Sequence, residues 1–472
     1  MSGGRAAWLA LALVALPARA MEVLHTDGGV VLEASGFAKS FVSSVWLQPS
    51  LVDGTRALQA VIDEVRPLVP PELASQVPAD VRLPSHVLLS AQVARVAAKA
   101  RYRELVSVDV AWQLTASLVS DAKFAAGSSL AGTIGGASSL AGAQRRLVDF
   151  EPVLATSGGL RVEHQLDRLN VRVALPFGDL TLGRQVLSWG SGRVWNPTDV
   201  LSPFPPTVVD REVRRGFDAA RLALALGPTT QLDLLYLPQR RAADNGGVAR
   251  FQTNVAGWDG AVSFGKYVSD LLVGLDVVGD VGPVSVHGEA AYTIALSGLG
   301  VAGEQVRVNE HFLRAVVGAE WRPHEKVLLG AEYHYNGFGA LTPADYLSKL
   351  SSARVTRGEV FGAGRHAAAV MAVWQAHELA ALSLVTLANL QDPSVLFIPS
   401  LEWSFAQSVL VRAGANLPVG ARPDADVFKR LGAADVVFQS DAFTTATKTL
   451  GLRSEHGTSP WAAFVQVGLY VP

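Results

Sequence analysis

The chain has 472 residues, of which 49% are hydrophobic and only 17% charged, and its formal net charge is −2. It contains no cysteine, which excludes disulfides and thiolate metal sites, and its near-neutral charge argues against a nucleic-acid partner. The length would allow two or three soluble domains, but no linker or shift in composition divides the chain.

The first twenty residues have the pattern of a secretory signal peptide. Arg5 precedes an apolar run over 6–16, and small residues at 18–20 supply a cleavage site after Ala20. The apolar run is too short to span a membrane as a helix. We therefore expect an exported chain whose mature part begins at residue 21.

After the signal peptide, short segments alternate apolar with polar residues. In 106–115, for example, Val106, Val108 and Val110 occupy one face and Ser107 and Asp109 the other. A soluble β-sandwich or a membrane β-barrel can produce this period of two. The high apolar content without any helix-length apolar run favours the barrel.

The alternating segments predict an all-β fold, a transmembrane antiparallel β-barrel of about 18 strands (16–18), which forms a single unit over 21–472. The expected strands are 30–46, 89–102, 106–115, 161–175, 180–190, 217–226, 231–237, 248–256, 261–267, 271–280, 284–296, 312–321, 327–336, 367–374, 380–390, 395–405, 409–417 and 461–471.

Connection lengths support this strand count. Under the assignment, short turns at Gly178, 227–228, 282–283, 323–325 and 406–407 fall on one side of the barrel. Short periplasmic turns opposite long extracellular loops are typical of bacterial outer-membrane barrels, so we expect a chain surrounded by outer-membrane lipid. The expected long loops lie near 48–88, 116–159, 191–216, 337–365 and 420–459.

One of these loops contains a predicted helix. Residues 53–68 place Leu58, Val61, Ile62 and Val65 on one face, and prolines end the pattern. The helix could fold into the lumen as a constriction, or it could cap the outer rim.

Charged residues of the strands fall in the polar phase, as expected for side chains that face a lumen. Basic residues come mainly from the first half and acidic ones from the second, which would give opposed walls and a field across the lumen. The alternative is that these charges pair locally across strands. The predicted pore-lining residues are Arg95, Lys99, Arg168, Arg172, Arg184, Arg221, Asp276, Glu289, Arg314, Glu320, Glu332 and Arg412.

A motif spans residues 183–221. It comprises Gly183-Arg184-Gln185, Trp189-Gly190, Asn196-Pro197-Thr198-Asp199 and Phe217-Asp218-Ala219-Ala220-Arg221. This stretch resembles the strand-loop-strand signature of alginate-export-like porins and related uncharacterised outer-membrane barrels.

The resemblance implies that Arg184 and Arg221 face the lumen near the outer loop and could meet an anionic solute, whereas Asp199, Asp210 and Arg211 help to fold the loop. The alternative is a salt-bridged loop clamp with no role toward a solute. The predicted loop-motif residues are Trp189, Asn196, Pro197, Asp199, Asp210, Arg211 and Asp218.

Catalytic patterns in the sequence are weak, and an outer-membrane hydrolase with a site on the barrel rim is a possibility that no motif supports. Residues 260–266 fit the first seven positions of a phosphate-binding loop, but Tyr267 replaces the Ser or Thr that would bind magnesium, and the match lies in a strand. His287 and His334 sit on polar faces of different strands, where we expect wetted lumen residues rather than ligands. No catalytic, cofactor-binding or metal-binding residue is therefore predicted, and we expect no enzyme.

The end of the chain departs from the barrel pattern. Outer-membrane barrels usually finish with an aromatic residue on the lipid face, but here Tyr470 shares its phase with Gln466 and is followed by Val471 and Pro472. With the fold, these observations predict a porin-like outer-membrane channel for passive diffusion of small polar or anionic solutes. The alternative is a β-barrel subunit of an envelope export or surface-attachment complex, whose outer loops bind a protein partner.

Overall fold

The computed structural model describes residues 21–26, 28–68, 80–121, 146–148, 152–208, 210–268, 270–296, 311–430, 435 and 451–471, and the predicted signal peptide lies outside them. The strands in these ranges are β1 Met21–His25, β2 Val30–Trp46, β3 His86–Tyr102, β4 Val106–Val119, β5 Val153–Ser157, β6 Leu160–Leu175, β7 Gly178–Gln185, β8 Phe217–Ala225, β9 Gln231–Leu237, β10 Gly246–Val255, β11 Trp258–Tyr267, β12 Asp270–Val281, β13 Val284–Ala295, β14 Phe312–His324, β15 Val327–Asn336, β16 His366–His377, β17 Ala380–Asn389, β18 Ser394–Ala406, β19 Val409–Val419 and β20 Trp461–Val471.

Eighteen of these strands form one closed antiparallel barrel. Each pairs with its neighbours in chain order, and the barrel closes where β2 pairs with β20 over Gly36–Val471 to Trp46–Trp461. The predicted fold class is thus confirmed, and each expected strand corresponds to one strand of the barrel. The observed strand ends differ from the predicted ones by a few residues: β4 extends to Val119, and β7 already ends at Gln185.

Two short strands lie outside the eighteen and were not predicted. β20 pairs with β2 only from Gly36 onward, and β1 occupies the remaining edge of β2 at residues 31–34. In the same way, β5 pairs with β6 at residues 160–163, beyond the reach of β7. Both strands cover stretches of strand edge that the stagger of the barrel leaves open.

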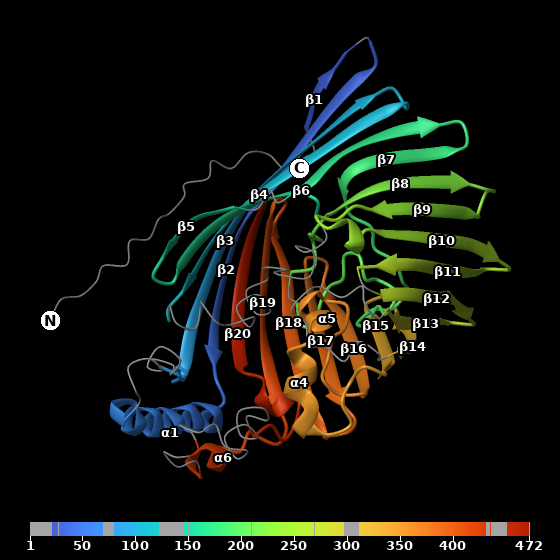
Figure 1. The fold of residues 1–472 in the computed structure, drawn as a ribbon. Helices are drawn as coiled ribbons and strands as arrows, with labels where there is room; N and C mark the ends of the chain where they lie inside the picture. The colour runs from blue at the N-terminus through green and yellow to red at the C-terminus, as the bar shows by residue number, and fades with distance from the viewer. Residues whose placement is uncertain are drawn as a thin grey trace.

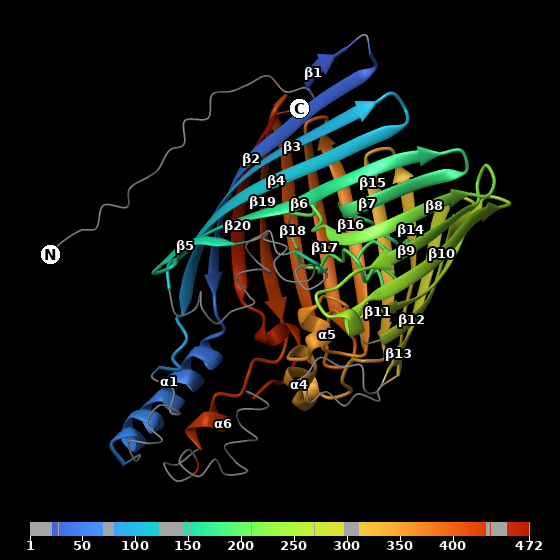
Figure 2. The same cartoon turned by 45° about the horizontal axis from the view of Figure 1, so that its top comes forward.

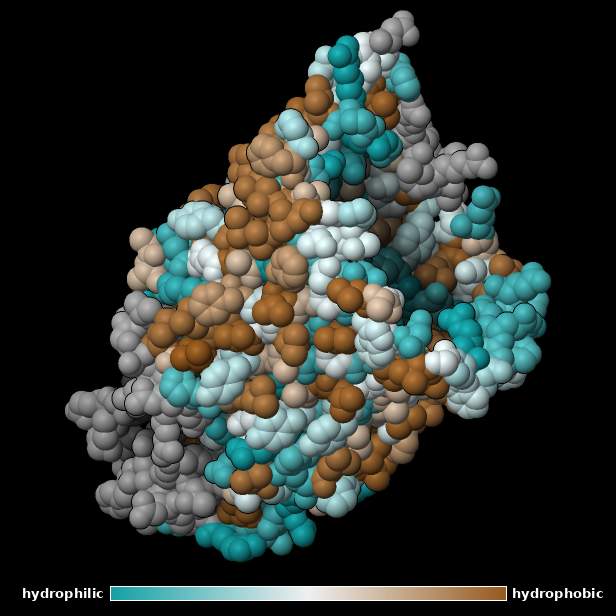
Figure 3. Space-filling model, turned by 90° about the vertical axis from the view of Figure 1, so that its right-hand side faces the viewer, coloured by the Kyte–Doolittle hydropathy of each residue, from teal (hydrophilic) through white to brown (hydrophobic). Residues whose placement is uncertain are grey.

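Along the strands, the apolar side chains are exposed and the polar ones are buried, which is the reverse of a soluble protein. In β11, Val262 and Phe264 are 51% and 55% exposed, whereas Ser263 between them is 1% exposed. Figure 3 shows apolar side chains spread over the outer face of the barrel. An apolar outer face and a polar interior suit a barrel in lipid and do not suit a sandwich.

The connections alternate as expected (Figures 1 and 2). The turns 176–177, 226–230, 282–283 and 407–408 are short and lie at the end of the barrel where β20 finishes. Most long connections lie at the other end, although residues 390–393 form a short one there.

Helices occur in the long connections. They are α1 Pro49–Val65, α4 Tyr346–Leu350, α5 Ala353–Thr356 and α6 Asp426–Lys429, with short 3₁₀ turns at Arg66–Leu68, Ala242–Asp244, Pro343–Asp345 and His456–Thr458. In the part of the chain that the structure describes, no helix has the length and apolarity needed to cross a membrane.

The predicted helix over 53–68 corresponds to α1 and lies at the rim, beside α6 (Figures 1 and 2). Its Val52 packs with Val45 and Val87 at the loop end of β2 and β3. Of the two predicted placements, the rim is correct and the lumen constriction is wrong. A helix with an apolar face requires an apolar surface, which the strand ends offer and the polar interior does not.

Candidate functional site: a segment that crosses the barrel interior

The connection between β7 and β8, residues 186–216, does not extend outward as expected but folds into the barrel. We call it the interior segment; position 209 lies outside the described residues. Its first part contacts side chains of β13 and β15, and its later part contacts β2, β19 and β20. These strands lie far apart around the barrel, and their polar side chains point inward, so the segment must cross the lumen.

Two wall glutamates hold the first part of the segment, and we call them the glutamate anchor. Glu289 of β13 accepts hydrogen bonds from the amides of Ser191 at 2.5 Å and Gly192 at 2.6 Å, and from Thr198 Oγ1 at 2.9 Å. Glu332 of β15 accepts from three successive amides, those of residues 193, 194 and 195. The charge on each carboxylate strengthens these bonds.

Glycine at position 190 makes this approach feasible. Its φ is +93°, and a Cβ there would lie only 2.6 Å from a carboxylate oxygen of Glu289. Any larger residue at Gly190 would therefore be strained in its backbone and would also collide with the anchor. The Trp189-Gly190 pair of the motif thus has a local structural explanation.

Both histidines of the polar faces belong to the same anchor, and the expectation that they are wetted is wrong. His287 Nε2 lies 2.9 Å from Glu332 Oε1, and the ring of His334 stacks on Trp195 at 5.1 Å between centroids. Each is 4% exposed. They pack against the interior segment because it fills the lumen beside β13 and β15.

Wall cations hold the later part of the segment, and we call this group the basic anchor. Lys39 of β2, itself 3% exposed, lies 2.6 Å from Asp210 and 2.8 Å from Glu212. Arg412 of β19 also pairs with Glu212 at 2.7 Å. Two neutral groups of β20 complete it: Gln466 donates to Asp210 at 2.9 Å, and the Tyr470 hydroxyl donates to Glu212 at 2.7 Å.

Tyr470 therefore faces inward, as its sequence phase indicated. Its hydroxyl bonds to Glu212 and its ring lies 6.0 Å from that of Phe37. Burial tends to raise the pKa of Glu212, but the hydrogen bonds from Lys39 and Tyr470 and the neighbouring positive charges outweigh it and hold that pKa below its usual value. Glu212 is thus held as a carboxylate at neutral pH.

The other motif residues form contacts within and around the interior segment. Asp199 pairs with Arg214 and accepts from Ser188. Burial raises the pKa of Asp199, and the Arg214 guanidinium offsets this only in part. Arg211 donates to the carbonyl of Pro206 at 2.6 Å, and burial lowers its pKa, with Arg214 adding to the effect.

Trp189 and Asn196 flank the turn that enters the glutamate anchor. The Arg250 guanidinium lies over the Trp189 ring at 5.3 Å, and Asn196 accepts no hydrogen bond at its buried Oδ1. The Asn196 carbonyl accepts from the amide of Asp199, which closes a tight turn around Pro197. These residues thus shape the chain rather than present groups to a solute.

The guanidinium of Arg184 is buried and held by partners within the protein. It is 2% exposed, pairs with Asp218 at 2.8 Å, and donates to the carbonyls of Leu166 and Val148. Asp218 also accepts from the amide of Leu147. Of the two interpretations of the motif, the salt-bridged clamp describes Arg184 and Asp218 better than a direct contact with a solute.

Most charged residues of the two predicted opposed walls pair with a residue of opposite charge. Lys99 is exposed and lies in register with Glu33 and Asp109. Arg314 donates to the Glu359 carbonyl of the 337–365 connection. The remaining predicted pore-lining residues outside the anchors pair as follows: Arg95 and Arg168 with Asp167, Arg172 with Asp179, Arg221 with Asp233, Asp276 with Arg250, and Glu320 with Arg193.

Several residues of the site were not predicted, with Lys39, Glu212 and Asp167 foremost. Asp167 is completely buried between Arg95 and Arg168. It is the extra residue of a bulge in β6, because Ala111 lies opposite Arg168 and Trp112 opposite Leu166. A bulge shifts the alternation by one residue, so the phase of the sequence could not place Asp167.

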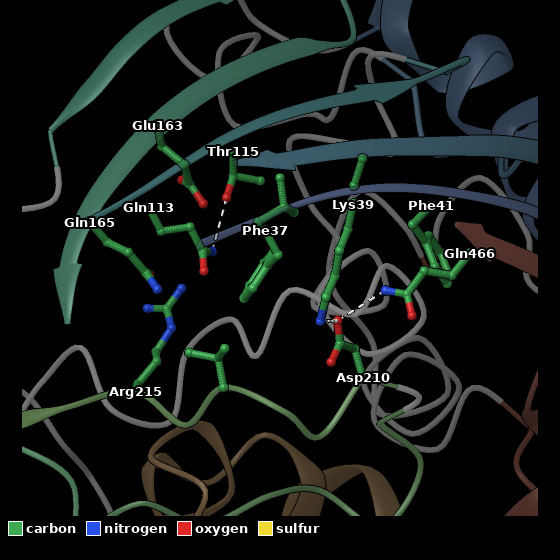
Figure 4. A pocket seen from close by; sticks show the side chains of 13 residues that line it. Phe37, Lys39, Phe41, Gln113, Thr115, Glu163, Gln165, Asp210, Arg215 and Gln466 are labelled. Carbon is green, nitrogen blue, oxygen red and sulfur yellow. Dashed lines mark hydrogen bonds and ion pairs between the residues drawn. The ribbon is translucent and has the colours of Figure 1, made fainter. Parts of the chain in front are cut away.

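Cavities remain on both sides of the interior segment. One, of about 50 Å³, lies between the segment and β2, β3, β4, β6 and β20, and Figure 4 shows its lining. The other, of about 190 Å³, lies between Pro206, Arg211 and strands β17 to β20. The segment therefore narrows the lumen without filling it.

Comparisons with known proteins define the fold and leave the family open. No family model matches the chain, and no curated protein is similar to it in sequence. The structure of Pseudomonas aeruginosa OccK5 (OpdH) matches with a TM-score of 0.51 at 9% identity, over 93% of this chain and 98% of that chain. Pseudomonas aeruginosa OpdQ matches with a TM-score of 0.51 at 10% identity, over 93% and 99% of the two chains.

At these identities the likeness concerns the fold alone. The chain has the porin-like fold of an outer-membrane β-barrel, closed by 18 antiparallel strands. The specific similarity to alginate-export-like porins has no support beyond the motif residues.

Proposed function

We propose that the protein is a porin-like channel of the bacterial outer membrane, which small polar or anionic solutes cross by passive diffusion. One observation carries the proposal: the interior segment is fastened at two sites on the wall, and cavities remain on either side of it. A fastened segment of this kind restricts the size and chemistry of what passes, whereas a barrel of 18 strands alone would leave a wide aqueous channel. No chemical step is proposed.

Polar solutes have more support than anionic ones. Arg184 and Arg221, which the motif resemblance assigns to an anionic solute, each pair with a carboxylate at 2.8 and 2.7 Å. A guanidinium in such a pair attracts a passing anion less strongly than a free one. The relation to alginate-export-like porins accordingly remains a hypothesis about ancestry and does not assign the solute.

Conductance across a planar lipid bilayer, measured on the purified and refolded protein, tests the proposal. We expect discrete open steps, and a salt gradient should give a weak ion selectivity because most wall charges are paired. A folded but silent barrel would contradict the proposal. It would favour the export or surface-attachment subunit, in which the interior segment is a plug and a protein partner binds the outer loops.

A further inference from the structure

The smaller cavity beside the interior segment has a lining whose charges balance. Two cations, Lys39 and Arg215, and two anions, Glu163 and Asp210, contribute to it. Lys39 and Asp210 pair with each other at 2.6 Å, and Glu163 pairs with Arg161 at 2.8 Å. An ion that enters this cavity would lose part of its water shell beside charges of both signs, so the lining as a whole favours neither sign.

Uncharged hydrogen-bonding groups dominate one wall of the cavity. Gln113 of β4 lies in register with Gln165 of β6, and Thr115 lies in register with Glu163. The four side chains therefore form two adjacent rows that point into the cavity (Figure 4). A carboxamide both donates and accepts hydrogen bonds, as a hydroxyl does, so this wall suits a solute that carries several hydroxyl groups.

An aromatic side chain faces this polar wall. Phe37 of β2 projects into the cavity between the glutamines and Lys39 (Figure 4). Sites for small polar molecules commonly combine an apolar or aromatic surface with a few placed polar groups, which fix the orientation of the ligand. A hydroxyl-bearing edge of a sugar could therefore enter beside Phe37 and bond to Gln113 and Gln165.

We infer that this cavity is a selectivity site for uncharged polyhydroxylated solutes, which insert a hydroxyl-bearing edge into its roughly 50 Å³ as they pass the interior segment, with Gln113 and Gln165 as the residues that recognise them. The inference rests on the proposed channel function and narrows its solute class. An anionic solute would have to use Arg215, whose guanidinium lies beside Gln165 in Figure 4, and would meet the carboxylate of Glu163 on the same wall.

Uptake into proteoliposomes tests the inference with three labelled solutes of one ring size: glucose, glucuronate and glucosamine. For the wild-type protein we expect glucose to enter several-fold faster than either charged sugar. Gln113→Leu and Gln165→Leu remove the amide and shorten the side chain by one bond, and they should each lower the glucose rate several-fold while ion conductance stays within a factor of two.

A matched control is Gln252→Leu. Gln252 of β10 lies in register with Ala261, on the inward face, and does not line the cavity. This variant should leave glucose uptake unchanged. Heat-modifiable migration on gels confirms that each variant is folded.

Three results would overturn the inference. They are glucuronate uptake that exceeds glucose uptake and is lost in Arg215→Gln, glucosamine uptake that exceeds glucose uptake, and a glucose rate that neither glutamine variant changes. In each case the wild-type protein still conducts ions. A wild-type protein that conducts no ions and admits no solute would instead contradict the channel function itself, so the two failures are distinguishable.

Discussion

The interior segment is held by opposite chemistry at its two sites of attachment. At the glutamate anchor, the wall supplies carboxylates and the segment supplies backbone amides. At the basic anchor, the segment supplies carboxylates and the wall supplies a lysine and an arginine. Backbone amides do not titrate and are kept in every substitution of the segment except one by proline, so the first attachment depends mainly on the wall carboxylates, with Thr198 Oγ1 as a side-chain donor of the segment to them. The second depends on side chains of both partners, and on pH.

This difference indicates that the two anchors have different roles in holding the interior segment. Glu332 is 3% exposed and Glu289 is 3% exposed, so the glutamate anchor is part of the packed interior. By contrast, the side chain of Glu212 in the basic anchor is 29% exposed. We expect the first anchor to set the path of the segment and the second to set how firmly its later part closes on β2 and β20.

The largest effect is expected from the double change Glu289→Gln and Glu332→Gln. Each substitution turns one acceptor oxygen toward the segment into a donor that faces N–H groups. A buried donor left unpaired costs about 1–3 kcal/mol, and several amides would be affected at once. Gels run after heating to graded temperatures should show the folded form lost at a distinctly lower temperature, and single-channel conductance should rise several-fold.

Glu320→Gln is the matched control for that experiment. Glu320 lies on β14, between the two anchor strands, and pairs with the half-exposed side chain of Arg193 rather than with the backbone. An exposed pair of this kind contributes at most about 1 kcal/mol. Equal effects of Glu320→Gln and of the double change would contradict the special role of the amide contacts.

Loss of the basic anchor should have a smaller and more local effect. Lys39→Met removes the buried cation between Asp210 and Glu212 but leaves Arg412 paired with Glu212. The loss should stay below the roughly 3–5 kcal/mol of breaking a fully buried pair. We expect a higher single-channel conductance, with a smaller decrease in unfolding temperature on gels than the double change gives.

Lys99→Met is the matched control for this change. It also removes one positive charge from the inward face of the wall, but from the neighbouring strand β3 and at an exposed position. It should change ion selectivity slightly and leave the size of the conductance steps unchanged. If Lys39→Met behaved like Lys99→Met, the basic anchor would not control closure of the segment.

The sequence predicted the wall of the barrel well and its interior poorly, for a physical reason. Strands such as 284–296 and 461–471 carry a period of two because lipid and lumen impose it at every second residue. The path of residues 186–216 is imposed by no such local rule. It depends on long-range pairs such as Asp210 with Lys39, which lie 171 residues apart in the chain.

The pattern of charges in the sequence predicted part of the barrel interior. Glu289 and Glu332 were correctly placed on polar faces, but their partners are main-chain amides, which every residue possesses. The opposed walls followed from counting charged residues on separate strands, whereas in the folded barrel a basic residue pairs with an acidic one nearby, as Arg221 does with Asp233. A rule of local charge pairing would have favoured the correct alternative.

Acid should loosen the basic anchor by protonating Glu212. The pKa of Glu212 is lowered in the folded protein. A lowered folded-state pKa means that the pairing contributes stability above the usual value of 4.5, and that this contribution is lost as pH falls through the lower folded-state value. Conductance should therefore be constant from pH 7 to 5 and rise only below about pH 4.5. Glu212→Gln should abolish that rise, and a rise already complete at pH 6 would contradict the assignment.

The smallest expected effect distinguishes a hydrogen bond from a packed ring within the basic anchor. Tyr470→Phe removes the hydroxyl that donates to Glu212 and keeps the ring against Phe37. A hydrogen bond to a charged group contributes about 1.5–3 kcal/mol when buried, and less here because Tyr470 is only half-buried. Since that bond helps to lower the pKa of Glu212, its loss should move the midpoint of the acid-induced rise upward, toward pH 4.5, with conductance at pH 7 unchanged. A midpoint that stays in place would mean that Lys39 and Arg412 alone hold Glu212 as a carboxylate.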